Sequence, residues 1–355
     1  MNIIAHLLIS LILYALFRNL YPISLQTLLS VDFIICAIAS ILPDLDHINM
    51  IGKALKTKRF GPEVRTWLHE LPGYLLFSII GVLVYFFISP EFGRAILIGF
   101  STHYFLDAVS RPTRPFHPVD DTIVFYYLAP RSDLKALVIY DAGITGILLG
   151  VFFLITTYAI NYEIFGYVII LLSLALLVYT IPKFEKYSSA HVSEEEYKEP
   201  ERLGVAKLAK EILQAILNPF VKLFSRISPD AISGLGLIFS IFVVVFLFIR
   251  NIPAAAVFLL ISLFLDAIDG EVARYRKEAS PSGWIIDVAT DRLSEIIISI
   301  ALPMLFILFT ILNTALSIRS KITGQHRIIP LRHIELIIFI IIIAFPELQA
   351  LLSLP

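Results

Sequence analysis

Residues 266–291 read DAIDGEVARYRKEASPSGWIIDVATD, and this stretch decides the architecture of the C-terminal half. Asp266 and Asp269 end one long apolar run, and Asp287 and Asp291 begin the next. Residues three or four positions apart share one face of a helix, and the proline and glycine between the two runs predict a turn. The stretch therefore predicts two antiparallel helices whose four carboxylates face one another at a similar depth.

The remainder of the chain is unusually apolar. Of its 355 residues 58% are hydrophobic, and the mean hydropathy is +0.84. These values exclude an ordinary soluble domain and favour a polytopic membrane protein. The net charge of −1 excludes a strongly basic nucleic-acid-binding protein, and the single cysteine, Cys36, excludes an intrachain disulfide.

Apolar runs that approach the length needed to cross a bilayer, about 20 residues, recur along the sequence. We predict eleven helices, at 3–21, 28–43, 72–89, 93–110, 141–159, 163–182, 231–250, 253–274, 283–303, 304–320 and 333–353. The first run lacks a basic leader and a small-residue cleavage site, so we expect a retained helix rather than a signal peptide. The predicted fold class is an all-α polytopic membrane protein with two transmembrane helical bundles of about six and five helices.

Lysine and arginine are divided unevenly among the loops. Alternate loops carry most of them, namely 44–71, 111–140, 275–282 and 319–332. Because positive loops remain in the cytoplasm, we predict a multi-pass protein of the cell (inner or plasma) membrane. Its N-terminus and the polar groups of both halves should lie on the cytoplasmic side.

A charged segment divides the chain. Residues 183–200 predict a solvated cytoplasmic linker. Over 201–228, apolar residues recur at helical spacing with lysines between them, which predicts an amphipathic juxtamembrane helix or, alternatively, a helix packed on the other domain. We therefore expect an N-terminal domain at 1–182 and a C-terminal domain at 201–355.

The four aspartates require a charge partner, because ionised groups in a membrane are costly and usually functional. A cluster of carboxylate oxygens suits hard divalent ions such as Mg²⁺ or Mn²⁺, and two such ions would stabilise the transfer of a phosphoryl-type group. The alternatives are ion pairs with Arg274, Arg276 and Arg292, or a cation pathway. Neither alternative requires the small residues that stand at fixed offsets between the aspartates, where a flat ligand could approach the backbone.

The spacing D-x2-D-G-x2-A-R-x8-G-x3-D-x3-D resembles the signature of the CDP-alcohol phosphotransferase family, and the resemblance covers about 200–340. Every specified position is filled, by Asp266, Asp269, Gly270, Ala273, Arg274, Gly283, Asp287 and Asp291. The resemblance implies phospholipid biosynthesis by transfer of a phosphatidyl-type group, diacylglycerol or archaeol phosphate, from a CDP-activated lipid to an alcohol. CMP would be released, and the enzyme would be a homodimer.

The resemblance also implies roles for these residues. The four aspartates would hold two Mg²⁺ or Mn²⁺ ions, and Asp291 would be the general base for the acceptor hydroxyl. The cytidine and diphosphate pocket would be lined by Asp266, Asp269, Gly270, Ala273, Arg274, Gly283 and Asp287. In two respects the chain departs from the family, since it has five predicted helices after the linker instead of six and a short stretch between Asp291 and Arg319.

Basic residues near the end of the chain are candidates for the acceptor site. They are Arg319, Lys321, Arg327 and Arg332. In family members with a phosphorylated acceptor, basic residues in this region hold its phosphate; the alternative is ordinary positive-inside charge. If the cluster is functional, inositol phosphate or glycerol phosphate is favoured over serine.

The N-terminal half contains a second polar group, of histidines and carboxylates. Its members are His6, Asp44, Asp46, His47, His69, His103 and Asp107. Such residues ligate Zn²⁺, Mn²⁺ or Fe²⁺, although a single histidine in a helix is more often a packing residue. Through AHLL, PDLDH and GFSTHYFLD this half resembles the membrane-bound metal-dependent hydrolases, a family with a LexA-regulated inner-membrane member. One histidine of that family's pattern is missing, where the chain reads VRTWLHE.

The fusion of the two halves suggests a reaction sequence. Transfer to a phosphorylated alcohol makes a lipid phosphate, which a metal-dependent phosphatase on the same leaflet could hydrolyse. The alternatives are that the N-terminal half is a non-catalytic scaffold, or that the whole chain is a cation transporter.

Overall fold

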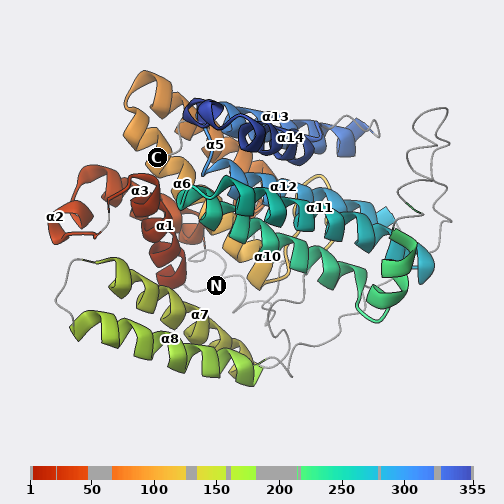
Figure 1. Ribbon diagram of the computed structural model, residues 1–355, viewed down its shortest axis with the longest axis horizontal. Coiled ribbons are helices and arrows are strands. Elements are labelled where there is room, and N and C mark those ends of the chain that lie inside the picture. The colour runs from red at the N-terminus through yellow and green to blue at the C-terminus, as the bar shows by residue number, and fades with distance from the viewer. Residues whose placement is uncertain are drawn as a thin grey trace.

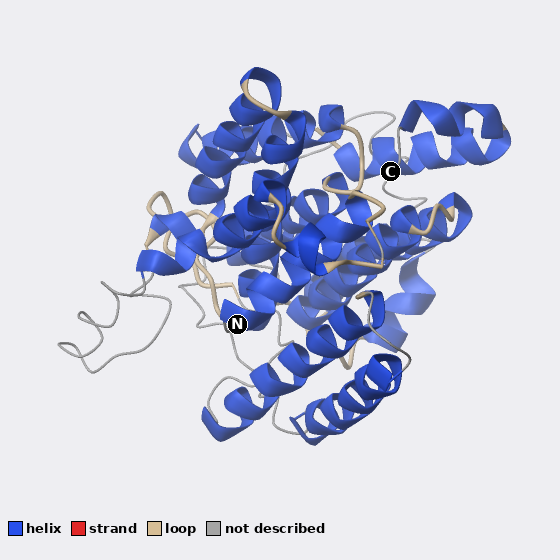
Figure 2. Cartoon of the chain, turned by 90° about the vertical axis from the view of Figure 1, so that its left-hand side faces the viewer, coloured by secondary structure: helices blue, strands red, loops and turns tan. Residues whose placement is uncertain are grey.

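The computed structural model describes residues 3–20, 22–46, 66–124, 134–156, 161–180, 214, 217–278, 281–323 and 329–352. Helices account for nearly all of the regular structure in these ranges, and the β-pairing there is limited to isolated bridges (Figure 2). The all-α class predicted from the sequence is therefore confirmed.

The helices follow the apolar runs of the sequence. In the N-terminal half they are α1 (Ile3–Phe17), α2 (Leu25–Leu28), α3 (Val31–Ile41), η1 (Leu42–Asp46), η3 (Trp67–His69), α5 (Leu71–Phe87), α6 (Pro90–Ser110), α7 (Leu134–Ile155) and α8 (Asn161–Thr180). In the C-terminal half they are α10 (Pro229–Phe248), α11 (Ile252–Tyr275), α12 (Pro281–Ser299), α13 (Met304–Thr323), α14 (Leu331–Ala344) and η5 (Pro346–Leu352). Each predicted segment overlaps one of these helices.

Prolines and capping residues set the helix boundaries. Ser89 caps α6 by accepting a hydrogen bond from the Phe92 amide, and Pro90 occupies the first position of that helix. Pro303 separates α12 from α13, which places the break inside the long apolar block of 283–320. The last predicted helix is shorter than expected because Pro346 ends α14 and begins a 3₁₀ turn.

Four helices in the described ranges, α7, α10, α11 and α13, are long and apolar enough to cross a membrane by length and composition. Three shorter apolar helices, α1, α5 and part of α8, accompany them. The chain is thus a membrane protein, while the division into six and five membrane-crossing helices and the N-in orientation stay predictions.

The juxtamembrane segment packs on its own half of the chain. Residues 201–213 and the linker 183–200 lie outside the described residues, but 217–224 are helical. Leu217 and Val221 are buried in an apolar cluster with residues of α10 and α11. The described part of this segment therefore covers the C-terminal bundle rather than the other domain.

One apolar core runs through both halves. Helix α6 contacts α1, α3 and α5 of its own half and α12 of the other half, while α13 contacts α5. The α7–α8 hairpin lies at the edge and meets the rest mainly through α1 (Figure 1). Arg94 of α6 adds a polar contact between the two halves, because it donates a hydrogen bond of 3.1 Å to the Leu302 carbonyl. The two halves consequently fix each other's polar groups in position.

Candidate active site

The signature aspartates lie on two adjoining helix ends. Asp266 and Asp269 belong to the last turns of α11, Asp287 belongs to the second turn of α12, and Asp291 lies near the middle of α12. Helix α11 ends with Lys277 in the left-handed region (φ 58°), where the Glu278 amide donates to the Ala273 carbonyl at 2.8 Å. Beyond this ending, Asp287 of α12 lies close enough to Asp266 of α11 to interact with it electrostatically.

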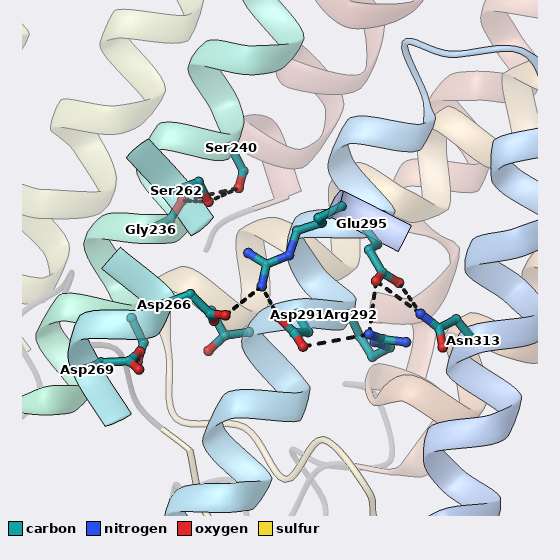
Figure 3. A network of polar contacts seen from close by, with 12 residues as sticks. Gly236, Ser240, Ser262, Asp266, Asp269, Asp291, Arg292, Glu295 and Asn313 are labelled. Atoms are coloured by element: carbon teal, nitrogen blue, oxygen red, sulfur yellow. Dashed lines mark hydrogen bonds and ion pairs between the residues drawn. The ribbon is translucent and has the colours of Figure 1, made fainter. Parts of the chain in front are cut away.

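A guanidinium lies between the carboxylates of the two helices. Arg332 of α14 places its Nη2 atom 3.1 Å from Asp266 Oδ2 and also contacts the Asp291 carboxylate. In Figure 3 the side chains of Asp266 and Asp291 approach this shared partner from either side. Both Asp269 and Asp287 interact electrostatically with Asp266. Two of the four aspartates, Asp266 and Asp291, thus share Arg332 as a partner, while the use of all four as one metal site stays a prediction.

The donor chemistry of the aspartates suits divalent metal ions. Carboxylate oxygens are the ligands that hard cations prefer, and Arg332 supplies positive charge to Asp266 and Asp291 in this structure. Of the three arginines in the ion-pair alternative, Arg274 and Arg276 pair with Glu271 and Glu278, at 2.7 and 2.8 Å. Arg274 also interacts electrostatically with Asp287, and Arg292 Nη2 lies 3.8 Å from Asp291 Oδ2. Ion pairing with arginine therefore accounts for part of the arrangement of the aspartates.

Asp269 is the buried member of the cluster. It is 3% exposed and accepts a hydrogen bond from the hydroxyl of Ser233 on α10. Sequence reasoning missed Ser233, although it stands in the SPDAIS segment that opens α10. Its hydroxyl fixes the orientation of a carboxylate that is expected to hold metal.

We predict that Ser233→Ala raises the Mg²⁺ concentration needed for half-maximal CMP release by about tenfold, the usual cost of losing such a supporting contact. A Mg²⁺ titration of the purified enzyme measures this. Ser240→Ala on the same helix is the control, because Ser240 donates to the Gly236 carbonyl instead. Equal requirements in the two variants would contradict the role of Ser233.

Packing against other residues of the chain does not require a glycine at position 270 of the signature. A Cβ atom at Gly270 would come no closer than 3.6 Å to its nearest neighbour, the Arg274 guanidinium, which is an ordinary contact. The Arg274 side chain is 42% exposed and is held by Glu271, which also accepts from Gln214 at 3.2 Å. Because Gly270 has no side chain, the surface beside Arg274 stays open, as a pocket for a nucleotide requires.

A buried polar network supports Arg332. Arg292 donates to Glu295 at 2.9 Å, and the Asn313 amide donates to both oxygens of Glu295 at 3.0 Å (Figure 3). Asn313 also exchanges two hydrogen bonds of 2.8 Å with the backbone of Ile329, two residues before α14. Sequence reasoning missed Glu295 and Asn313, whose signal was their polarity inside an apolar block. Together they fix the start of α14 and hence the position of Arg332.

We predict that Asn313→Leu destabilises the protein by about 3 kcal/mol or more, because Glu295 and the Ile329 backbone lose buried partners. Thermal unfolding in detergent measures the loss. Thr314→Val serves as the control, since Thr314 is equally buried on α13 but bonds only to the Thr310 carbonyl of its own helix. Similar melting temperatures for the two variants would show that the hydrogen bonds of Asn313 do not hold the start of α14 in place.

Among the described residues, the predicted acceptor residues Lys321 and Arg332 have different ion-pair partners. Arg332 contacts Asp266 and Asp291, whereas Lys321 pairs with Asp120 of the N-terminal half at 2.8 Å. Arg319 is exposed, and Arg327 lies outside the described residues. Their role in binding an acceptor phosphate stays a prediction.

The histidines and carboxylates of the N-terminal half come together from four elements. Ligand atoms of Asp44, His69, His103 and Asp107 lie within 4.8 Å of one another, and all four residues are buried. His6 stacks on His103 with ring centroids 4.2 Å apart, and its Nε2 atom is 3.2 Å from Asp107 Oδ1. His47 and the side chain of Asp46 lie outside the described residues.

The tautomer of His103 suits metal binding. Its Nδ1 atom lies 2.9 Å from the Ser40 carbonyl, which can only accept, so Nδ1 carries the proton. The lone pair of Nε2 is therefore directed into the cluster, 3.9 Å from Asp107 Oδ2, and Nε2 has no hydrogen-bond partner among the described residues. A histidine oriented by a carbonyl, together with two buried carboxylates, fits a divalent transition metal.

Comparison with known families agrees with both resemblances. The YdjM inner membrane protein family matches residues 1–184, and the CDP-alcohol phosphatidyltransferase family matches residues 226–352. No curated protein and no solved structure gives a match. The second family transfers phosphatidyl groups in phospholipid biosynthesis, uses CDP-alcohol substrates and generally depends on Mg²⁺ or Mn²⁺. The chain therefore belongs to the YdjM inner membrane protein family, and its C-terminal part is a CDP-alcohol phosphatidyltransferase domain.

Proposed function

We propose that the C-terminal domain, residues 201–355, transfers a phosphatidyl-type group from a CDP-activated lipid to inositol phosphate or glycerol phosphate. The observation that carries this proposal is that Asp266 of α11 and Asp291 of α12, two aspartates of the signature, share the guanidinium of Arg332 as a partner. A cation transporter would not need Gly270 and Arg274 of the signature beside these aspartates. The domain limits, the cytoplasmic placement and the homodimer are parts of the same proposal.

Each residue of the site would have its own part in the reaction. Asp266, Asp269, Asp287 and Asp291 would hold two Mg²⁺ or Mn²⁺ ions, which would neutralise the diphosphate of the substrate. Asp291 would accept the proton of the acceptor hydroxyl. The hydroxyl oxygen then bonds to the β-phosphorus, the bond from that phosphorus to the CMP oxygen breaks, and CMP leaves with the electron pair. Arg274, on the exposed side of α11, would steady the diphosphate.

The proposal is tested by CMP release. Purified protein in detergent receives CDP-diacylglycerol or CDP-archaeol with Mg²⁺ or Mn²⁺, and separately inositol phosphate, glycerol phosphate, inositol, glycerol or serine. Release that requires one alcohol identifies the acceptor. Folded protein that releases no CMP with any of them would reject the proposal.

A second activity is favoured by the buried site of the N-terminal half, residues 1–182. We propose that Asp44, His69, His103 and Asp107 hold one Zn²⁺, Mn²⁺ or Fe²⁺ ion, which would supply a Lewis acid for hydrolysis of the lipid phosphate product. A cavity of about 20 Å³ adjoins His69, room for a water molecule. Water would add to phosphorus while the ester bond breaks, releasing inorganic phosphate and the lipid alcohol. Protein that makes the lipid phosphate but never releases phosphate would leave this half as a metal-binding scaffold.

A further inference from the structure

A loop of the N-terminal half extends to the transferase domain. We call residues 111–124, which follow α6, the bridging loop. Thr113 and Val124 close its base through two backbone hydrogen bonds of 2.9 and 2.8 Å. The amide of Arg114 donates to Glu70 at 3.0 Å, and the amide of Leu71 donates to the carbonyl of Pro115 at 3.0 Å. The loop is thereby fixed to the start of α5, next to the buried metal cluster.

The far end of the bridging loop contacts α12 and α13. Asp120 forms an ion pair with Lys321, in which Asp120 Oδ2 and Lys321 Nζ are 2.8 Å apart. Phe116, which is 1% exposed, stacks on Trp284 with an interplanar angle of 15°. The Lys321 ammonium lies 5.6 Å from the centre of the same Trp284 ring. Asp120 of the bridging loop is therefore in contact with Lys321, which the sequence analysis predicts to be part of the acceptor site.

The position of Trp284 places this ion pair beside the face of α12 that carries Asp287 and Asp291. Trp284, Asp287 and Asp291 are three and then four residues apart on α12, so they share one face of the helix. Lys321 lies over the first turn of that face. An anion that approaches Asp291 along α12 would meet Lys321 and, with it, the charge of Asp120.

Asp120 is ionised at neutral pH. Its partial burial would raise the pKa of the carboxyl group, but hydrogen bonds from Lys321 and from the Thr122 amide outweigh burial and hold the pKa below its ordinary value. The loop thus keeps a fixed negative charge beside Lys321. That charge competes with a phosphate for the lysine.

We infer that Asp120 of the N-terminal half sets the selectivity of the transferase site for its acceptor, by weakening the attraction of Lys321 for a phosphorylated alcohol. The inference rests on the proposed transferase function and adds a residue outside the transferase domain to it. Removing one unit charge next to the lysine, in partly aqueous surroundings, changes the affinity for a phosphate by a factor of about three to ten.

The test compares Asp120→Asn with Asp121→Asn, its neighbour in the same loop, which is also ion-paired, with Arg114 at 3.1 Å. We expect Asp120→Asn to lower the KM for the phosphorylated acceptor three- to tenfold, with kcat and the KM for the CDP-lipid within twofold of the parent. Asp121→Asn should leave all three values unchanged. In a Lys321→Gln background, Asp120→Asn should no longer change the acceptor KM, which identifies the lysine as the mediator.

Several outcomes would overturn the inference. An acceptor KM that is unchanged or raised in Asp120→Asn, with a lower melting temperature, would make the ion pair a simple domain contact. An enzyme that uses only an unphosphorylated alcohol would also refute it, while leaving the transferase intact. Absence of CMP release from the parent protein with every alcohol would reject the proposed function itself, and the inference with it.

Discussion

Asp291→Asn is expected to reduce CMP release at least 100-fold while leaving the protein folded. Asparagine keeps the size of the side chain, but it cannot take the proton of an acceptor hydroxyl, and general bases contribute about 10²–10⁴-fold. It also removes a charge from the pair with Arg332. Initial rates at saturating CDP-lipid and acceptor measure the effect on kcat.

A matched control separates this loss from the effect of breaking any aspartate–arginine pair. Asp141 on α7 pairs with Arg111 at 3.5 Å and belongs to neither cluster, so Asp141→Asn should keep nearly full activity. A Mn²⁺ series then distinguishes two roles of Asp291. Recovery of the Asp291→Asn rate at high Mn²⁺ would make Asp291 a metal ligand only, whereas a rate that stays low supports its role as the base. Retention of more than half of the activity would refute both roles.

The second large effect concerns the metal content of the N-terminal half. Protein purified without chelator should carry about one transition-metal ion per chain, and His103→Gln should lose most of it. The reason is that His103 directs the lone pair of Nε2 into a buried cluster and supplies one of its two imidazole ligands, which transition metals favour. Elemental analysis of the purified protein measures the ratio directly, without relying on any activity.

His117→Gln is the control, because His117 is a partly exposed histidine that pairs with Asp121 in the bridging loop. It should retain the metal. The loss should also lower thermal stability, since a metal that binds only the folded state contributes its binding free energy to folding. Equal metal content in His103→Gln and the parent, or no metal in either, would contradict the proposed site.

The helices and the pairing of aspartates along each helix could be predicted from the sequence because both depend on local patterns. Apolar runs ended by proline gave the helix positions, and spacings of three and four put Asp266 with Asp269 and Asp287 with Asp291. The convergence of His103 and Asp107 on one face of α6 followed from the same rule.

The partners of the basic residues could not be predicted in this way. Arg332 reaches Asp266 because Asn313 holds the backbone of Ile329, a contact between segments whose crossing no local pattern determines. The pair of Asp120 and Lys321 depends on the docking of the two halves, 201 positions apart in sequence. Such contacts arise only when the whole core is assembled.

The guanidinium of Arg332 is a counter-ion for Asp266 and Asp291 that belongs to the same chain as they do. Newly made protein must fold in the bilayer before it has collected its metals, and bare carboxylates crowded at that depth would repel one another. An arginine on the last long helix, α14, neutralises part of that charge as soon as the bundle closes. Folding in the membrane would then not depend on the supply of ions, and a site that lost its metals could regain them without unfolding.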